Sequence, residues 1–242
     1  MLYPLSTLAL APVLICQGRY VRRVTPRLPE PEGERQGTAG NGPELRLLIL
    51  GDSAAAGVGV SNQQDALAGQ LVRELAKDYC VTWGLLAETG RTAAEVLAAL
   101  GAAPKAHYDV VLVSLGVNDV TGRTSTGQWL SVLNELSDRL INSMGATRVL
   151  FTAIPPMHLF PALPQPLRWY LGMRARQLNT LMENLCNDGA YGEDSLEYLC
   201  VSFPLEPGFM AADGFHPGLD AYRLWAEHSA AAIRKLAQTT VA

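Results

Sequence analysis

The residues best suited to chemistry in this 242-residue chain lie in four short segments, each where an apolar run ends or a helical pattern begins. The first, Gly51-Asp52-Ser53, follows the apolar run Leu47–Leu50. The other three are Glu88–Thr92, Gly116–Asp119 and Asp213–Pro217. A serine directly after a buried strand can be a nucleophile, but it can also be a helix cap or an ordinary turn residue. Ser53 alone therefore decides nothing.

Together the four segments contain the groups that acyl transfer from a serine requires. His216 can accept the Ser53 proton, and Asp213 can hold the imidazole in the right tautomer and stabilise its cation. The backbone N–H groups of Ser53 and Gly90 and the side-chain amide of Asn118 can meet at the developing oxyanion. Each such donor is typically worth ~2.7–4 kcal/mol of transition-state stabilisation. The sequence thus predicts a Ser-His-Asp triad with three oxyanion donors.

The same residues also have plainer interpretations. Asp213 and His216 are what a turn residue and a surface histidine would look like, and Asn118 and Asp119 can close a turn by hydrogen bonds to the backbone. We expect Asp119 to brace the loop that presents the asparagine. We expect Asp52 to shape the turn before the serine, not to act as the triad acid. The remaining histidines lack a motif and are expected to be surface or structural residues: His107, His158 and His228.

The body of the chain alternates apolar runs with segments of helical periodicity. Continuous apolar runs predict strands over residues 45–50, 79–86, 109–115, 148–154 and 197–203. Helical spacing predicts helices over residues 64–77, 92–100, 128–144, 167–186 and 219–237. Strands interleaved with helices in this way predict a three-layer α/β/α sandwich around a parallel sheet. Ligands bind beyond the carboxyl ends of such strands, where the four segments would lie.

Composition excludes several other classes of protein. The content of 48% hydrophobic and 17% charged residues suits a globular domain with a sizeable core. A net charge of -4 and a pI near 5.6 give no basic face for a nucleic-acid partner. The four cysteines lack metal-ligand spacing, so we expect no metal; a Cys186–Cys200 disulfide stays open. The segment Gly51–Gly59 lacks the ending of a P-loop, so we expect no nucleotide cofactor.

The first 44 residues differ from the body. Residues 1–18 are uncharged and mostly apolar, and an arginine cluster follows them. A cleavable signal peptide carries its positive charge before the apolar part. We therefore expect residues 1–18 to be an uncleaved membrane anchor, with the following domain on the cytoplasmic side. The segment can also lie in the membrane interface or dock on the domain as a soluble element. A periplasmic and a soluble cytoplasmic location stay open as well. Residues 19–44, basic and then rich in Pro, Gly and Glu, predict an exposed linker before a catalytic domain over residues 45–242.

The four segments resemble, in order, the signature blocks of the SGNH (GDSL) hydrolases. The resemblance covers most of the chain and implies a flavodoxin-like fold with a five-stranded parallel sheet. It places the family's catalytic serine, glycine, asparagine, histidine and acid at Ser53, Gly90, Asn118, His216 and Asp213. The sequence departs from the family pattern before the glycine, where Leu86–Thr89 lacks the usual upstream asparagine.

The resemblance implies an activity among esterases, lipases, thioesterases and carbohydrate deacetylases. The proline-rich, apolar segment Ile154–Tyr170 suits an acyl chain better than a sugar, although it can also pack on the domain's own helices or contact a membrane. We predict a cofactor-free hydrolase of small-molecule or lipid carboxylic esters with short to medium acyl chains, with a lysophospholipid or a thioester as candidates. An acyltransferase with the same triad and a non-catalytic, membrane-tethered binding protein are the alternatives.

Overall fold

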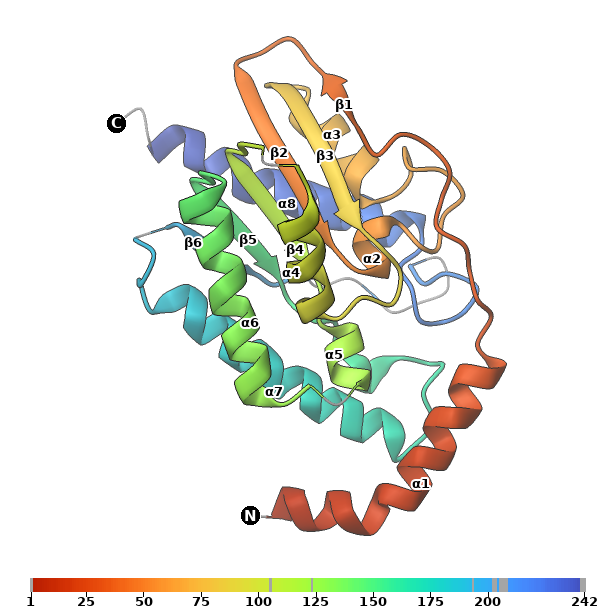
Figure 1. The fold of residues 1–242 in the computed structure, drawn as a ribbon. Coiled ribbons are helices and arrows are strands. Elements are labelled where there is room, and N and C mark those ends of the chain that lie inside the picture. The colour runs from red at the N-terminus through yellow and green to blue at the C-terminus, as the bar shows by residue number, and fades with distance from the viewer. Residues whose placement is uncertain are drawn as a thin grey trace.

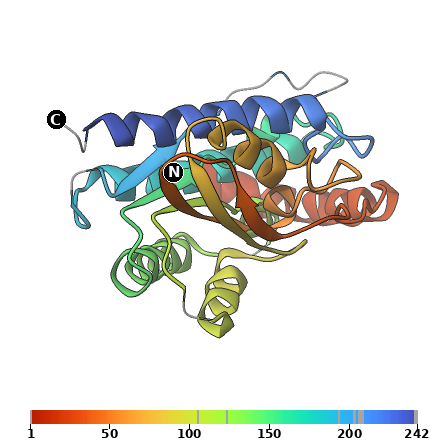
Figure 2. The same ribbon diagram turned by 90° about the horizontal axis from the view of Figure 1, so that it is seen from above.

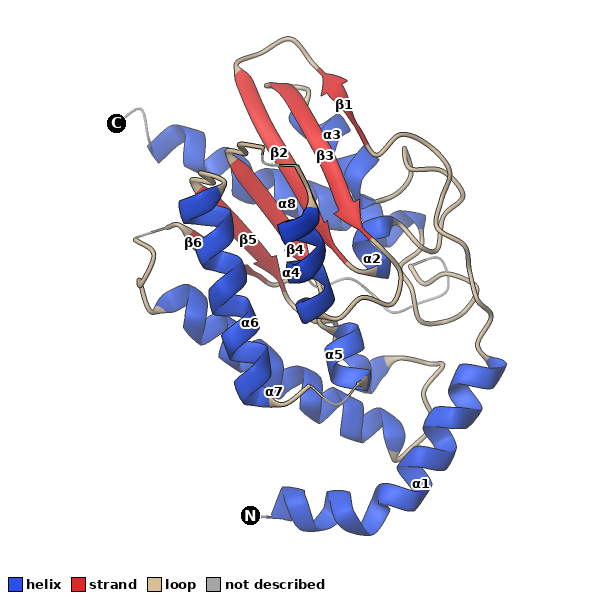
Figure 3. Cartoon of the chain, viewed as in Figure 1, coloured by secondary structure: helices blue, strands red, loops and turns tan. Residues whose placement is uncertain are grey.

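A mostly parallel sheet runs through the middle of the computed structural model, which describes residues 2–104, 106–122, 124–192, 194–201, 204 and 209–239. Its strands are β1 (Gln36–Ala39), β2 (Glu44–Gly51), β3 (Cys80–Ala87), β4 (Val110–Ser114), β5 (Arg148–Thr152) and β6 (Leu196–Leu199). Their order is β1-β3-β2-β4-β5-β6 (Figures 1 and 3). Strands β2 to β6 are parallel, and β1 pairs antiparallel with β3 at one edge.

Helices cover both faces of this sheet. The helices of the described residues are α1 (Leu2–Val24), α2 (Ser53–Ala56), α3 (Leu67–Leu75), α4 (Ala93–Ala102), α5 (Val117–Thr121), α6 (Thr126–Asp138), α7 (Leu167–Asn187) and α8 (Leu219–Thr239). A π-helical turn, Arg139–Ser143, continues α6, and a 3₁₀ turn spans Met157–Leu159. Figure 2 shows α3 and α8 on one face and α4 and α6 on the other. The molecule is therefore a three-layer α/β/α sandwich.

The fold class predicted from the sequence is confirmed. The five parallel strands have the order 2-1-3-4-5 among themselves, which is that of the flavodoxin-like fold. Their bounds differ from the predicted ones by a few residues. The strand predicted over residues 197–203 ends at Leu199, and its residues 202 and 203 lie outside the described residues. The sixth strand, β1, was not predicted, because its residues are mostly exposed and have no apolar pattern.

The core consists of two apolar clusters, one on each face of the sheet. In β2, Leu48 and Leu50 belong to the cluster that α4, α6 and α7 cover, whereas Leu47 and Ile49 face α3 and α8. Strand β4 is buried along its whole length, as expected of a parallel strand covered on both faces. The two largest fully buried side chains keep their polar groups bonded: Trp129 Nε1 donates to Leu178 O at 3.1 Å and Tyr222 OH to Val58 O at 2.7 Å.

Helix α1 includes the first arginines of the basic cluster, since it continues past residue 18 to Val24. Leu14 and Val21 are buried against the domain, and the Gln17 side chain bonds the backbone at the start of α7, to Gln165 O at 2.6 Å and from Leu167 N at 3.0 Å. Figure 1 shows the chain running from α1 along the side of the domain to β1. None of the helices within the described ranges is long and apolar enough to cross a membrane.

The turn between β2 and α2 is held by Asp52. Its Oδ1 accepts a hydrogen bond from Ala54 N at 3.1 Å and so caps α2, and its own N–H donates to Ser114 O at 3.1 Å. This agrees with the expectation that Asp52 shapes the turn. Its second carboxyl oxygen, Oδ2, is buried and accepts no hydrogen bond from the described residues. Burial raises the pKa of Asp52 from its usual 3.8 to about 7.

This buried carboxyl makes stability depend on pH in a predictable direction. Because the folded-state pKa of Asp52 is raised, the folded protein loses stability as the pH rises from about 4 through about 7, by at most ~1.4 kcal/mol per pH unit. Asp52→Asn keeps the capping oxygen and removes the charge. We expect the melting temperature of the variant to exceed that of the wild type by more at pH 8 than at pH 5. The exposed Asp65→Asn is the control. A difference in melting temperature between Asp52→Asn and the wild type that is the same at pH 5 and pH 8 would contradict the raised pKa of Asp52.

Candidate active site

The structure joins the three predicted triad residues in one chain of hydrogen bonds. Ser53 is the first residue of α2, and Asp213 and His216 lie in the loop that precedes α8. Ser53 Oγ lies 2.9 Å from His216 Nε2. His216 Nδ1 lies 2.6 Å from Asp213 Oδ2. Two segments 163 residues apart in the sequence are therefore brought together with the geometry of a nucleophile, a base and an orienting acid.

Asp213 is placed to hold the histidine ring. Its side chain is buried, and its Oδ1 accepts hydrogen bonds from the backbone N–H groups of Phe215 at 2.9 Å and His216 at 3.0 Å. Burial alone would raise the pKa of Asp213, but the hydrogen bonds from the His216 ring and from these two N–H groups hold that pKa below its usual value. An ionised carboxylate thus faces Nδ1, which leaves Nε2 directed at the serine.

The three predicted oxyanion donors follow the carboxyl ends of neighbouring strands. Within the described residues, neither the Ser53 N–H nor the Gly90 N–H donates to another residue. The Asn118 amide donates one hydrogen from Nδ2 to Arg91 O at 2.9 Å, which leaves its second N–H available. Three donors with spare hydrogens therefore come from the ends of β2, β3 and β4.

The loop that presents Asn118 is braced by a buried acid. Asp119 Oδ2 accepts from Ala93 N at 2.9 Å and its Oδ1 from Thr124 Oγ1 at 2.9 Å, so the role expected for Asp119 is the one observed. Burial raises its pKa. Arg174 of α7 also holds this region, donating from Nε to Val120 O at 3.1 Å. The sequence pattern of α7 gave no reason to expect that contact.

Gly116 is required where β4 meets α5. Its φ of +115° is a conformation that only glycine adopts easily, and a β-carbon there would lie 2.7 Å from Ile154 and 2.9 Å from Trp129. Asn179 fastens the facing segment, since its amide bonds both the N–H and the carbonyl of Ile154 at 2.8 Å each. The glycine of the segment Gly116–Asp119 thus allows close packing beside the site.

A mostly apolar cavity opens beside Ser53 and His216. It contains about 740 Å³ of empty space, including that at its mouth. Its apolar lining includes Leu115, Val117, Pro155, Phe160, Leu199, Val201, Met210, Phe215 and Trp225. Of the roles considered for the segment Ile154–Tyr170, packing on the domain is observed, since Met157 and Leu163 are buried in the core; Pro155 and Phe160 of the same segment line the cavity. Phe160 packs edge-on against Phe215, with ring centroids 5.2 Å apart.

The other chemically capable residues do not join this constellation. Cys16, Cys80, Cys186 and Cys200 are unpaired thiols, and burial raises the pKa of Cys186 to about 12. His107 and His228 are exposed, and His158 is partly buried on the 3₁₀ turn. Within the described ranges, no group of three or more His, Cys, Asp or Glu residues is arranged to hold a metal ion.

One contact to the site comes from a residue that the sequence did not single out. Glu30 lies in the segment between α1 and β1, and its Oε1 accepts hydrogen bonds from the N–H and the hydroxyl of Thr89, each at 2.7 Å. Thr89 directly precedes Gly90. Nothing in the sequence pattern around Glu30 distinguishes it from the glutamates beside it.

Comparisons with known proteins agree with this geometry. Residues 49–224 match the GDSL-like Lipase/Acylhydrolase family. A GDSL-like esterase of Mycobacterium tuberculosis is 26% identical over an alignment of 246 residues, gaps included. The alignment covers 92% of this chain and 76% of that protein. The esterase EstA of Pseudoalteromonas sp. is 20% identical, with a TM-score of 0.56 over 80% of this chain and 98% of that one. A family 3 carbohydrate esterase of Clostridium thermocellum is 13% identical, with a TM-score of 0.62 over 83% of this chain and 100% of that one.

The two solved structures share the fold, and their different substrate classes do not transfer to this chain at such identities. The family match, in contrast, does assign the chain to a family, because it spans well over half of the chain and includes all four predicted segments. The chain therefore belongs to the GDSL-like lipase/acylhydrolase family and is a carboxylic ester hydrolase.

Proposed function

We propose that the chain hydrolyses esters of short to medium acyl chains through an acyl-enzyme intermediate on Ser53. The observation that carries the proposal is the continuous hydrogen-bond chain from Ser53 through His216 to Asp213, which opens on an apolar cavity. A serine alone is a weak nucleophile. An adjacent base, itself held by an ionised acid, supplies the activation that the reaction needs.

Each step moves one proton through His216. As Ser53 Oγ attacks the carbonyl carbon of the ester, His216 Nε2 takes the hydroxyl proton, and it then gives that proton to the departing alcohol oxygen. A water molecule next attacks the acyl-enzyme with His216 again as the base. The bond between the acyl carbon and Ser53 Oγ then breaks, His216 returns the proton to Oγ, and the acid product leaves. Asp213 stays ionised throughout, because its hydrogen bonds hold its pKa low.

The negative oxygen of each tetrahedral intermediate is stabilised by the donors of Ser53, Gly90 and Asn118. Support comes from their lack of competing partners: the two backbone N–H groups are unpaired within the described residues, and the amide has one hydrogen to spare. Donors already in place need no reorganisation when the charge develops, which is what makes such groups effective.

A series of p-nitrophenyl esters from acetate to palmitate tests this proposal. We expect turnover that is highest for short to medium chains and that falls by a factor on the order of 10⁶ in Ser53→Ala. The exposed Ser61→Ala is the control and should keep full activity. Activity that survives Ser53→Ala would refute the nucleophile assignment. Adding an alcohol and identifying the products would show whether water or the alcohol receives the acyl group, which separates a hydrolase from an acyltransferase.

The apolar cavity is proposed to hold the acyl group. Val201 lines it and is only partly buried, so a larger side chain there fills the cavity with little demand on the core. We expect Val201→Phe to lower kcat/KM for the longer esters of the series at least tenfold more than for acetate, because each CH₂ excluded from the cavity forfeits ~0.8 kcal/mol. Val201→Thr, similar in shape, is the control. An equal loss of kcat/KM for every acyl-chain length would instead assign the cavity to the alcohol part of the ester.

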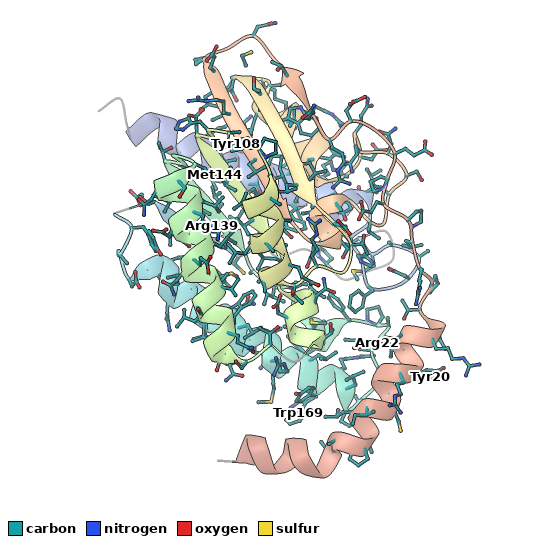
Figure 4. All side chains as sticks on the ribbon, viewed as in Figure 1. Tyr20, Arg22, Tyr108, Arg139, Met144 and Trp169 are labelled. Atoms are coloured by element: carbon teal, nitrogen blue, oxygen red, sulfur yellow. The ribbon has the colours of Figure 1, made fainter. Side chains whose placement is uncertain are left out.

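The exposed face of α1 is proposed to contact an anionic membrane surface without crossing it. Val13, Tyr20 and Val24 are 44%, 61% and 52% exposed, and at 3.6 residues per turn they lie within about 40° of one another around the helix. Figure 4 shows Tyr20 directed away from the domain. Around the helix, this apolar stripe lies about 60–120° from Leu14 and Val21, which pack on the domain.

The basic residues of α1 favour anionic headgroups as the partner of this stripe. The exposed residues Arg19, Arg22 and Arg23 lie on the same helix, although the chain as a whole carries a net charge of -4. Apolar side chains next to basic ones are typical of helices that lie in the membrane interface. Trp169 of α7, 38% exposed, lies near α1 and adds an interfacial type of side chain (Figure 4).

Co-sedimentation with lipid vesicles tests this contact. We expect the protein to bind vesicles of phosphatidylcholine and phosphatidylserine but not of phosphatidylcholine alone. Replacing the three α1 arginines by glutamine should lower the partition coefficient on the order of 100-fold, since each contributes ~1 kcal/mol near an anionic surface. Equal binding to both kinds of vesicle, or no loss in the arginine variant, would contradict the proposal.

A further inference from the structure

The Gly90 N–H depends on the conformation of a single turn. Residues 88–91 form a β-turn, in which Arg91 N donates to Glu88 O at 3.4 Å, and Gly90 has a φ of +89°. That φ is typical of the third residue of a type II turn. In the type I alternative the central peptide is rotated by about half a turn, so the N–H of the third residue points to the opposite side. Glycine at the third position favours the type II conformation but also adopts type I readily, so the sequence of the turn alone does not hold it in one of them.

Contacts to the residues on either side of Gly90 restrain the turn. On the C-terminal side, Arg91 O accepts from the Asn118 amide. On the N-terminal side, Glu30 Oε1 accepts from both the N–H and the hydroxyl of Thr89, at 2.7 Å each. Within the turn, Arg91 Nη2 donates to Glu88 Oε2 at 2.5 Å and Glu88 N donates to Gly51 O at 3.4 Å, whereas a β-carbon built on Gly90 meets no atom within 4 Å. Gly90 is thus held through the residues on either side of it, and Glu30 supplies the side-chain hydrogen bonds to Thr89.

Glu30 is itself held in place. Its Oε2 pairs with Arg35 Nη1 at 2.9 Å, and Arg35 Nη2 donates to Ala87 O, the last residue of β3. The Arg35 carbonyl in turn accepts from Leu85 N. The hydrogen bonds from Thr89 and the charge of Arg35 hold the pKa of Glu30 below its usual value, although burial acts in the opposite direction. An ionised carboxylate, tied to the sheet by Arg35, therefore meets Thr89.

We propose that Glu30 is a positioning residue for the oxyanion site, which acts through Thr89 to hold the Gly90 N–H in the conformation that faces the reacting carbonyl. The proposal rests on the function proposed above, because it assigns the same Gly90 donor. Glu30 touches neither the substrate nor the reacting atoms. Its effect is to keep a donor in place before the charge develops, so its loss should weaken transition-state binding and leave substrate binding unchanged.

The test compares Glu30→Ala and Glu30→Gln with Glu34→Ala, which removes an exposed carboxylate from the same segment. Rates on p-nitrophenyl butyrate are divided by the concentration of active sites, titrated with a fluorophosphonate, so that unfolded protein does not count. We expect kcat to fall about 100-fold in Glu30→Ala with KM unchanged. Glu30→Gln, whose amide oxygen still accepts from Thr89, should recover most of that loss. The affinity for a trifluoromethyl ketone, whose adduct carries the oxyanion, should fall in parallel with kcat/KM.

A second measurement separates this inference from the proposed function. The amide signal of Gly90 in ¹H–¹⁵N spectra reports the turn whether or not the protein turns over an ester. We expect one Gly90 signal at the same position in wild type and Glu34→Ala, and a shifted or doubled signal in Glu30→Ala. An unchanged Gly90 signal, or an unchanged kcat per active site in Glu30→Ala, would overturn the inference. A wild type inactive on every ester but with the Gly90 signal displaced in Glu30→Ala would overturn the proposed function alone.

Discussion

The close pairing of the ends of β2 and β4 is the constraint on which the site depends. Gly51 lies opposite Ser114 in the parallel register, and a β-carbon on Gly51 would come within 1.8 Å of Ser114 O. The N–H of Asp52 donates to that same carbonyl, so the chain leaves the sheet one residue before Ser53. The serine and the segment that carries Asn118 therefore emerge side by side at the carboxyl edge of the sheet. Any side chain at position 51 would force these two strand ends apart.

Much of the fold could be predicted because buried strands and helices have recognisable patterns of apolar residues. A parallel strand covered on both faces has to be apolar at successive positions, and β4 shows this at Val110–Val113, the first four of its five buried residues. Helices α7 and α8 are long enough for their periodicity to be read. The residues of the site could be predicted for a related reason: Ser53, Asn118 and His216 each stand beside the end of a recognisable element, where this architecture places ligands.

The features that the sequence did not predict are short, exposed or stabilised by distant partners. Strand β1 forms because the edge of β3 offers unpaired backbone groups, and its own four residues carry no apolar pattern. Helices α2 and α5 have four and five residues, fewer than a periodic pattern needs. Glu30 contacts Thr89 across 59 residues, and Arg174 contacts Val120 across 54. No local pattern distinguishes such polar residues from those that meet only solvent.

The position of Glu30 has a consequence for how the family region is understood. The match to the GDSL-like family begins at residue 49, whereas Glu30, Arg35 and β1 all precede it. The segment between α1 and β2 is thus more than a tether, because it completes the sheet edge and reaches the turn of Gly90. The signature residues lie within the matched region, whereas the residues that support the turn of Gly90 from outside, Glu30 and Arg35, lie before it. These two parts of the chain can therefore diverge independently. Two proteins with identical signature residues can therefore differ in how firmly the turn of Gly90 is held.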